Sequence, residues 1–185
     1  MKLTLRKILL LAAAFVGVLV FVFSFVAAYR VTGGNGWFEY QSVIWGSGRI
    51  NYSDGSASIL ANDNRYPALV LPLIGAILII LSAICLCAVA FAGDKLVKDK
   101  KMRMIIVLVA GGLLVLGGVF MFFAPGQFVK AYATKNDISV ENVDAAWKTA
   151  LLSSTISKSC ALPVVSGILA ILGGGAAVVS QFVKE

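Results

Sequence analysis

The sequence predicts an all-α membrane protein: a four-transmembrane-helix bundle that carries a small extracytoplasmic β-hairpin and an amphipathic helix. Two observations lead to this prediction. Hydrophobic residues make up 59% of the 185 residues and charged residues only 14%, against about 45–50% and about 25% in soluble domains. Four long stretches also contain no Asp, Glu, Lys or Arg. We therefore expect one integral membrane domain over residues 1–185.

The four uncharged stretches predict transmembrane helices at about residues 8–29, 67–93, 104–124 and 159–183. Each comes near or exceeds the roughly 20 residues that a helix needs to cross a hydrocarbon core. An alternative for the first stretch is a cleaved signal peptide, because basic residues precede it. Its apolar run is longer than the roughly 7–15 residues usual in such peptides, so an uncleaved helix is the preferred interpretation.

The basic residues predict the orientation of the helices. They gather before the first helix, in the link 94–103 and after the last helix, as Lys2, Arg6, Lys7, Lys95, Lys98, Lys100, Lys101, Arg103 and Lys184. The positive-inside rule places both termini and the link in the cytoplasm, and the loops 30–66 and 125–158 outside. We expect a multi-pass protein of the cell (plasma) membrane. The net charge of +7 is then explained by the orientation of the helices in the membrane. Attraction to anionic lipid headgroups is a weaker interpretation of the same residues. No nucleic-acid partner is expected.

The first outer loop has the pattern of a hairpin. Polar and apolar residues alternate from Trp37, Gly46-Ser47-Gly48 is a plausible turn, and a short return strand ends at Ser53. Its aromatic residues are candidate partner-binding residues, because aromatic side chains are enriched in protein interfaces. The alternative is that they anchor the loop at the membrane surface. They are Trp37, Tyr40, Trp45 and Tyr52.

The second outer loop predicts a different element. Pro125-Gly126 is expected to end or bend the third helix. Apolar residues then recur at helical spacing, as Val140, Val143, Trp147 and Leu151. We expect an amphipathic helix that lies on the outer membrane surface or over the hairpin. Trp147 is the fifth candidate partner-binding residue.

Glycines mark close-packing faces on the membrane helices. Seven residues separate Gly111 from Gly118, and Gly167 from Gly174, so each pair shares one helix face; Gly17 forms a small-xxx-small pair with Ala13. Small residues let helix backbones approach closely. These five glycines are candidate helix-packing residues, either within one bundle or against another subunit.

Residues able to do chemistry are scarce. No acid, base or histidine falls within the predicted spans, and ion-coupled transporters normally need such groups near the membrane midplane. Cys85 and Cys87 are two residues apart and Cys160 has no evident partner, so all three are interpreted as small apolar fillers. We expect no catalytic residues, no metal site and no cofactor, and hence no enzyme.

The layout resembles that of the claudin and peripheral-myelin-protein-22 superfamily. The shared features are four helices, internal termini, a strand-bearing first outer loop and a shorter second loop. Trp37 and Trp45-Gly46 faintly echo the family's Trp and Gly-Leu-Trp residues, whereas its two loop cysteines are absent. The resemblance implies that the outer loops form a small β-sheet above the bundle. It implies no site residue.

The function expected from the sequence is that of a non-catalytic integral membrane interaction protein: an accessory subunit, a scaffold or an adhesion-like component. Its partners would be the lipid bilayer and a membrane protein or a second copy of the chain. The alternative is a passive channel or a subunit of a transporter complex, which the small residues and Ser24, Ser82 and Ser166 support.

Overall fold

The computed structural model of the chain describes residues 4–33, 38–46, 48–52, 57–59, 68–135, 137, 139–141, 156–159 and 161–183. The chain divides into two compact units. The bundle unit comprises Met1–Val22, Ile74–Met121 and Val165–Glu185, and the sheet unit comprises Phe23–Leu73 and Phe122–Val164.

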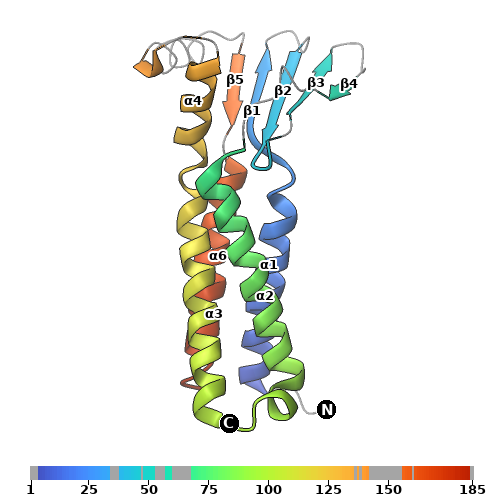
Figure 1. The fold of residues 1–185 in the computed structure, drawn as a ribbon. Helices are drawn as coiled ribbons and strands as arrows, with labels where there is room; N and C mark the ends of the chain where they lie inside the picture. The colour runs from blue at the N-terminus through green and yellow to red at the C-terminus, as the bar shows by residue number, and fades with distance from the viewer. Residues whose placement is uncertain are drawn as a thin grey trace. The chain divides into compact units, whose positions relative to one another are not determined.

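The bundle unit is built from four long helices that run side by side (Figure 1). They are α1 (Leu5–Phe23), α2 (Val70–Leu96), α3 (Lys100–Met121) and α6 (Ala161–Val179). All four are long and apolar enough to cross a membrane. The prediction of four long apolar helices is therefore confirmed.

Two helix boundaries differ from the sequence prediction. The first helix was expected to reach residue 29 but ends at Phe23, because β1 begins at Ala27. The fourth was expected to start at 159 but starts at Ala161, because β5 ends at Ser159. An apolar run can form either a helix or a buried strand, so charge-free length alone could not place these ends.

The link predicted at residues 94–103 is shorter in the structure. The second helix extends past residue 93 to Leu96, and the third starts at Lys100 rather than 104. The Asp99 carboxylate accepts a hydrogen bond from the backbone N–H of Lys101 at 2.9 Å. This is an N-cap contact, which explains why a helix can begin within the charged segment.

The bundle helices are apolar on their outer faces as well as inside. Buried side chains include Val20, Ile79 and Leu114, each fully enclosed. On the outside, Phe15 is 67% exposed and Leu172 is 64% exposed. A helix that is hydrophobic all round is typical of a membrane span, and the bilayer is the natural environment of these faces.

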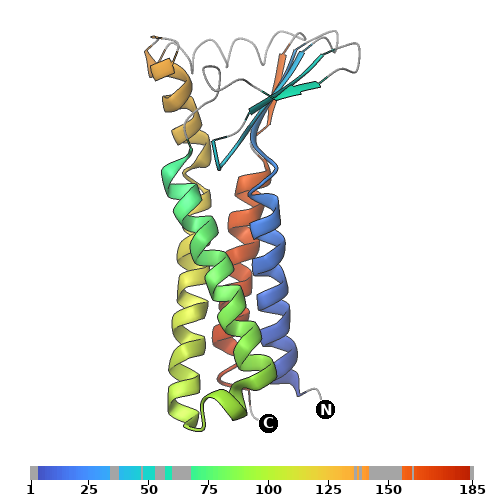
Figure 2. The ribbon, with the colours of Figure 1, turned by 45° about the vertical axis from the view of Figure 1, so that its right-hand side comes forward.

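The sheet unit contains a five-stranded antiparallel sheet in the order β4-β3-β2-β1-β5 (Figure 2). Its strands are β1 (Ala27–Gly33), β2 (Phe38–Val43), β3 (Gly48–Tyr52), β4 (Ala57–Ile59) and β5 (Ile156–Ser159). Four strands come from the segment before α2, and β5 comes from the segment before α6. Backbone pairing, with Arg30 opposite Ser159, joins the two segments in one sheet.

The sheet is larger than the sequence analysis expected. Only a two-stranded hairpin was predicted, over Trp37–Ser53; in the structure β2 and β3 are two members of a five-stranded sheet, with Phe38 opposite Tyr52. A protein described as all-α therefore also has a substantial β part. The physical reason is that two strands alone are marginally stable in water, and each added neighbour satisfies further backbone groups.

The second predicted loop also contains an unexpected helix, α4 (Ala124–Lys135). The helical path does break after α3, at Phe122 and Phe123, but it resumes with Pro125 in the first turn. Proline is tolerated there because the first N–H groups of a helix have no intrahelical acceptor. Of the amphipathic helix expected at 140–151, Val140 and Glu141 are helical, and the remaining residues lie outside the described part.

Candidate partner-binding site

Trp45 lies in the turn between β2 and β3 and makes two specific contacts within the sheet unit. Its indole Nε1–H donates a hydrogen bond to Ser24 Oγ at 2.9 Å. Its ring stacks on Phe25, with a centroid distance of 5.1 Å and an interplanar angle of 3°. Ser24 is buried and Phe25 is 55% exposed. The Trp45 side chain therefore links the turn to the residues directly after α1.

Neighbouring residues extend this link to two more segments. The buried Ile44 accepts a hydrogen bond at its carbonyl oxygen from the N–H of Leu69, at 3.0 Å. Gln127 Oε1 accepts another from the N–H of Leu71, at 3.3 Å. We call Ser24, Ile44, Trp45, Leu69 and Gln127 the turn cluster. It joins the end of α1, the β2–β3 turn, the start of α2 and α4.

The turn itself depends on one glycine. Gly46 has a φ of 80°, a left-handed conformation that side chains with a Cβ rarely adopt. It directly follows Trp45, so the position of the indole depends on a turn that only glycine forms without strain.

The other aromatic candidates have different positions. Tyr40 in β2 is paired with Ile50, and Tyr52 in β3 is paired with Phe38. Tyr40, Trp45 and Tyr52 thus belong to two neighbouring strands and the turn that joins them. Trp37 and Trp147 lie outside the described residues.

The candidate helix-packing glycines of α3 and α6 lie opposite one another in the bundle unit. A Cβ added to Gly174 would lie 2.6 Å from the carbonyl oxygen of Gly111, and one added to Gly118 would lie 2.7 Å from that of Gly167. The seven-residue spacing of each pair is two helical turns. The two helices therefore meet at two glycine contacts, two turns apart.

Gly17 and one further pair complete the close contacts. A Cβ on Gly17 would lie 2.8 Å from Ala83 Cβ, which brings α1 against α2. A Cβ on Gly117 would lie 2.8 Å from the carbonyl oxygen of Gly75, which brings α2 against α3. Sequence reasoning missed Gly75, whose only signal is that it interrupts a run of large apolar residues.

Two glycines of α3 and α6 face open space instead. A Cβ on Gly112 or Gly175 would meet nothing within 4 Å. They are neighbours of Gly111 and Gly174 in the chain, so glycine content alone does not identify a contact. Each pair of neighbours offers one contact position and one matched control position.

Two buried serines in the bundle unit bond locally. Ser82 Oγ donates to the carbonyl oxygen of Leu78 at 2.7 Å, and Ser180 Oγ to that of Ala177 at 2.6 Å. Among the described residues, no three His, Cys, Asp or Glu side chains form a group that could hold a metal ion. Cys85 and Cys87 are free thiols.

Comparison with known proteins adds no family to this picture. No protein-family model matches the chain, and no curated protein is significantly similar to it.

Proposed function

We propose that this chain is a non-catalytic membrane interaction protein that binds a membrane protein partner through its sheet unit. The observation that carries the proposal is the five-stranded sheet, which is assembled from two segments more than 90 residues apart in the chain. The two segments are joined where β1 pairs with β5, from Arg30↔Ser159 to Gly33↔Ile156. A chain of four spans needs only short connections. Segments long enough to build a sheet supply a recognition surface that the spans do not.

The distribution of contacts in the bundle unit supports this choice of surface. Its closest glycine approaches, at Gly117, Gly118 and Gly174, pack one helix of the bundle against another. Its outer faces carry large exposed hydrophobic side chains such as Phe15, Phe91 and Leu172, as expected for contact with lipid acyl chains. The bundle thus serves as the membrane anchor, and the sheet unit is left for recognition.

The aromatic residues of the sheet unit are proposed to have two different roles, one structural and one in partner binding. Trp45 is committed to Ser24 and Phe25, so it holds the turn in place. Tyr40 and Tyr52, on neighbouring strands, are the proposed partner-binding residues, together with Trp37 and Trp147. Tyrosine suits such a role because it combines a large apolar ring with a hydroxyl.

The layout of the membrane protein is proposed as well. Both termini and the link between α2 and α3 are placed in the cytoplasm, and the sheet unit outside the plasma membrane, on the strength of the basic residues at 2–7 and 95–103. Four helices with a sheet built from both connecting segments support the resemblance to the claudin and peripheral-myelin-protein-22 superfamily, which we retain as a proposal.

A passive channel within one chain is a weaker candidate. Residues from different helices, among them Val20, Ile79, Leu86, Val107 and Leu114, are at most 2% exposed and fill the described interior with apolar side chains. A conducting path needs polar or water-accessible lining. The channel alternative therefore requires several copies of the chain, which the experiment below distinguishes.

Purification in a mild detergent, followed by mass analysis of the intact assembly, tests the proposal. We expect a stoichiometric heterologous membrane protein that is lost when Tyr40 and Tyr52 are both replaced by Thr, a residue that also favours strands. Gly112→Ala, at an open position in the bundle, is the matched control and should retain the partner. A ring containing only copies of this chain would support the channel instead.

A further inference from the structure

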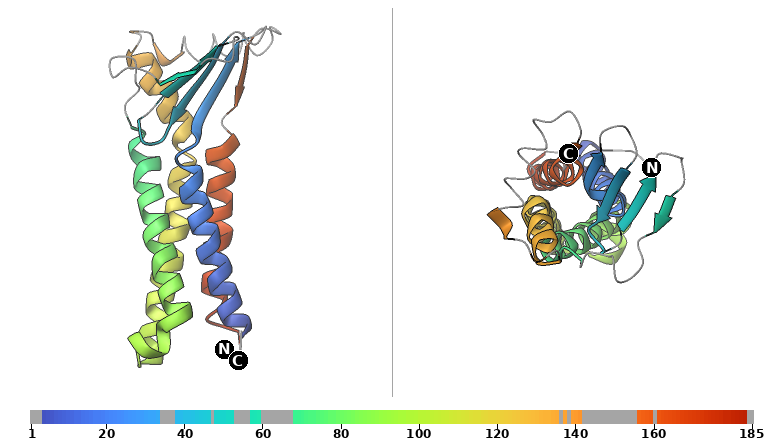
Figure 3. Two further views of the ribbon diagram at one scale, coloured as in Figure 1. Left: turned by 90° about the vertical axis from the view of Figure 1, so that its right-hand side faces the viewer. Right: turned by 90° about the horizontal axis from the view of Figure 1, so that it is seen from above.

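One end of the bundle unit, where α2 is linked to α3, carries a concentration of positive charge. Among the described residues, 4–7 and 94–103 contain two and five basic residues, seven in all, against the two acids Asp94 and Asp99. The first turns of α1 and α3 and the last turns of α2 and α6 lie at this end (Figure 3). Because two helices begin and two end here, their dipoles largely cancel, and the positive potential comes from the basic side chains.

Two arginines at this end are held close to the helices rather than extended into solvent. Arg6, in the first turn of α1, donates from Nη2 to Gln181 Oε1 at 2.6 Å. Gln181 Nε2 in turn donates to Ser180 Oγ at 2.8 Å. This chain of hydrogen bonds ties α1 to the end of α6 and fixes the position of the Arg6 guanidinium.

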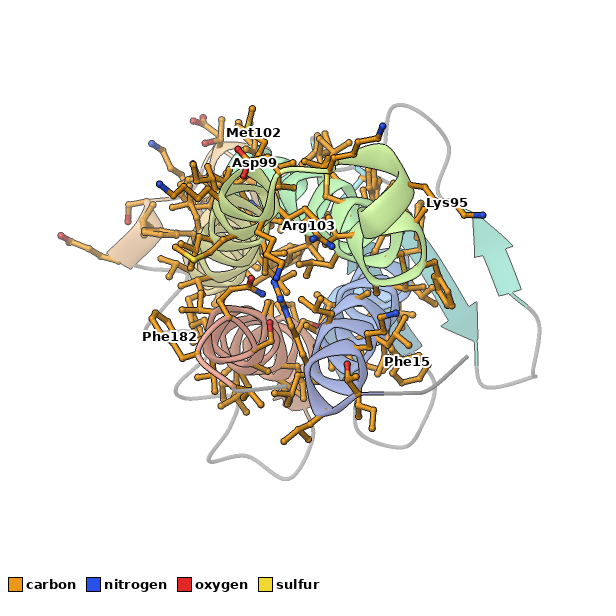
Figure 4. All side chains as sticks on the ribbon, turned by 90° about the horizontal axis from the view of Figure 1, so that it is seen from below. Phe15, Lys95, Asp99, Met102, Arg103 and Phe182 are labelled. Carbon is orange, nitrogen blue, oxygen red and sulfur yellow. The ribbon has the colours of Figure 1, made fainter. Side chains whose placement is uncertain are left out.

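Arg103 is held by the opposite pair of helices. A Cβ on Gly93, in the last turns of α2, would lie 3.4 Å from Arg103 Cδ and 4.0 Å from its Nη1. The side chain therefore reaches from α3 across to α2, toward the middle of the bundle end, while Lys95 and Phe182 point away (Figure 4). Both arginines are half-buried, whereas Lys100 and Lys101 are exposed.

Apolar side chains border this basic end. Phe182 is 73% exposed, Leu5 58%, Met102 53% and Ile8 47%. Since guanidinium groups bind phosphate with paired hydrogen bonds and stay charged at all physiological pH values, a fitting ligand has a phosphate and an adjoining acyl chain.

We propose that Arg6 and Arg103 form a binding site for the phosphate of an anionic phospholipid at the basic end of the bundle. A lipid is favoured over free phosphate because Leu5 and Met102, which adjoin Arg6 and Arg103 in the chain, are 58% and 53% exposed and would contact its acyl chains. The site differs from general surface attraction in one respect. It depends on the two held arginines more than on the exposed lysines, although both carry the same charge.

Native mass spectrometry of the full chain, released from detergent with equal amounts of phosphatidylglycerol and phosphatidylcholine of identical acyl chains, tests this site. The wild type should retain phosphatidylglycerol preferentially. The double variant Arg6→Gln, Arg103→Gln should bind it about tenfold more weakly, as expected for lost charged hydrogen bonds. The control Lys100→Gln, Lys101→Gln removes the same charge from exposed positions and should stay within about twofold of the wild type.

Three results would overturn the proposal. The first is equal retention of both lipids by the wild type. The second is an equal loss of phosphatidylglycerol binding in the two double variants. The third is displacement of the lipid by inorganic phosphate at micromolar concentration, which would indicate a site for the free anion. If the arginine variant does not fold, the wild-type measurement still decides, together with Arg6→Lys, Arg103→Lys. That variant keeps the charge but loses the paired geometry, and it should bind phosphatidylglycerol more weakly than the wild type.

Discussion

Gly111 and Gly174 are in mutual backbone contact: a Cβ on Gly174 would lie 2.6 Å from the Gly111 carbonyl oxygen, and a Cβ on Gly111 would lie 3.1 Å from that of Gly174. Seven residues further along α3 and seven residues back along α6, a Cβ on Gly118 would lie 2.7 Å from the Gly167 carbonyl oxygen. The two positions fix both the separation and the register of two antiparallel helices. Register follows because a shift of either helix would bring larger residues into the contacts.

Gly174→Ala should therefore destabilise the protein. The new methyl group would overlap both the Gly111 carbonyl oxygen and Val115 Cγ2, each at 2.6 Å, and overpacking of this kind costs about 1–3 kcal/mol. The measurement is the free energy of unfolding in mixed detergent micelles.

Gly175→Ala is the matched control for this variant, since nothing lies within 4 Å of its added Cβ. Its stability should be unchanged, or raised by up to about 1 kcal/mol through helix propensity. Equal losses in the two variants would mean that α3 and α6 do not meet at these glycines.

Gly117→Ala should also destabilise, through a different helix pair. Its Cβ would lie 2.6 Å from Ile79 Cγ1 and 2.8 Å from the Gly75 carbonyl oxygen. We expect a loss of about 1–3 kcal/mol. If Ile79 accounts for most of the overlap, Ile79→Ala, which removes Cγ1, should destabilise the Gly117→Ala chain less than it destabilises the wild type, and the same unfolding experiment measures the difference.

The spacing of these glycines was readable from the sequence, but their partners were not. A seven-residue interval shows that Gly111 and Gly118 share a face, and the structure was needed to show that the face meets Gly167 and Gly174. Gly75 has no other glycine three, four or seven residues away, so the sequence carried no short glycine spacing that singled it out. Contacts between distant helices depend on bundle geometry, which local patterns do not contain.

The sheet shows a second limit of sequence reasoning. β1 continues an apolar run that suits a membrane helix, and β5 is the short polar segment Ile156–Ser159, which has little strand propensity of its own. Both become strands because they pair with each other and because β1 pairs with β2. Strand formation that relies on a distant partner overrides local preference.

Trp45 and Ser24 should be energetically coupled. Trp45→Phe and Ser24→Ala each remove one partner of the 2.9 Å hydrogen bond. In a double-mutant cycle, the coupling free energy should be about 0.5–1.5 kcal/mol, the usual net value of such a bond. Ser82→Ala, whose hydroxyl bonds within its own helix, should combine additively with Trp45→Phe. Additivity in both cycles would argue against the contact.

Gly46→Ala should weaken the turn between β2 and β3, because its φ of 80° places an added Cβ in a left-handed conformation that costs about 1–2 kcal/mol. Gly46→Asn should cost less, since asparagine tolerates this region best among residues with a Cβ. Thermal unfolding can rank the three proteins. An alanine variant as stable as the wild type would contradict the conformation of this turn.

The proposed orientation predicts the labelling of single cysteines in a chain whose three native cysteines are replaced. A membrane-impermeant maleimide added to intact cells should label Ser56→Cys and leave Lys98→Cys unlabelled until the membrane is opened. Labelling of Lys98→Cys alone would place the basic link outside and reverse the orientation.

Recognition through the sheet unit is the central claim, and site-specific photo-crosslinking in native membranes tests it most directly. A photoreactive phenylalanine replaces Tyr52 in β3 or, as the comparison, Leu172, which is 64% exposed on α6. We predict a discrete protein crosslink from position 52 and only lipid adducts from position 172. A protein crosslink from position 172, with none from position 52, would contradict the account and place the partner contact on the bundle.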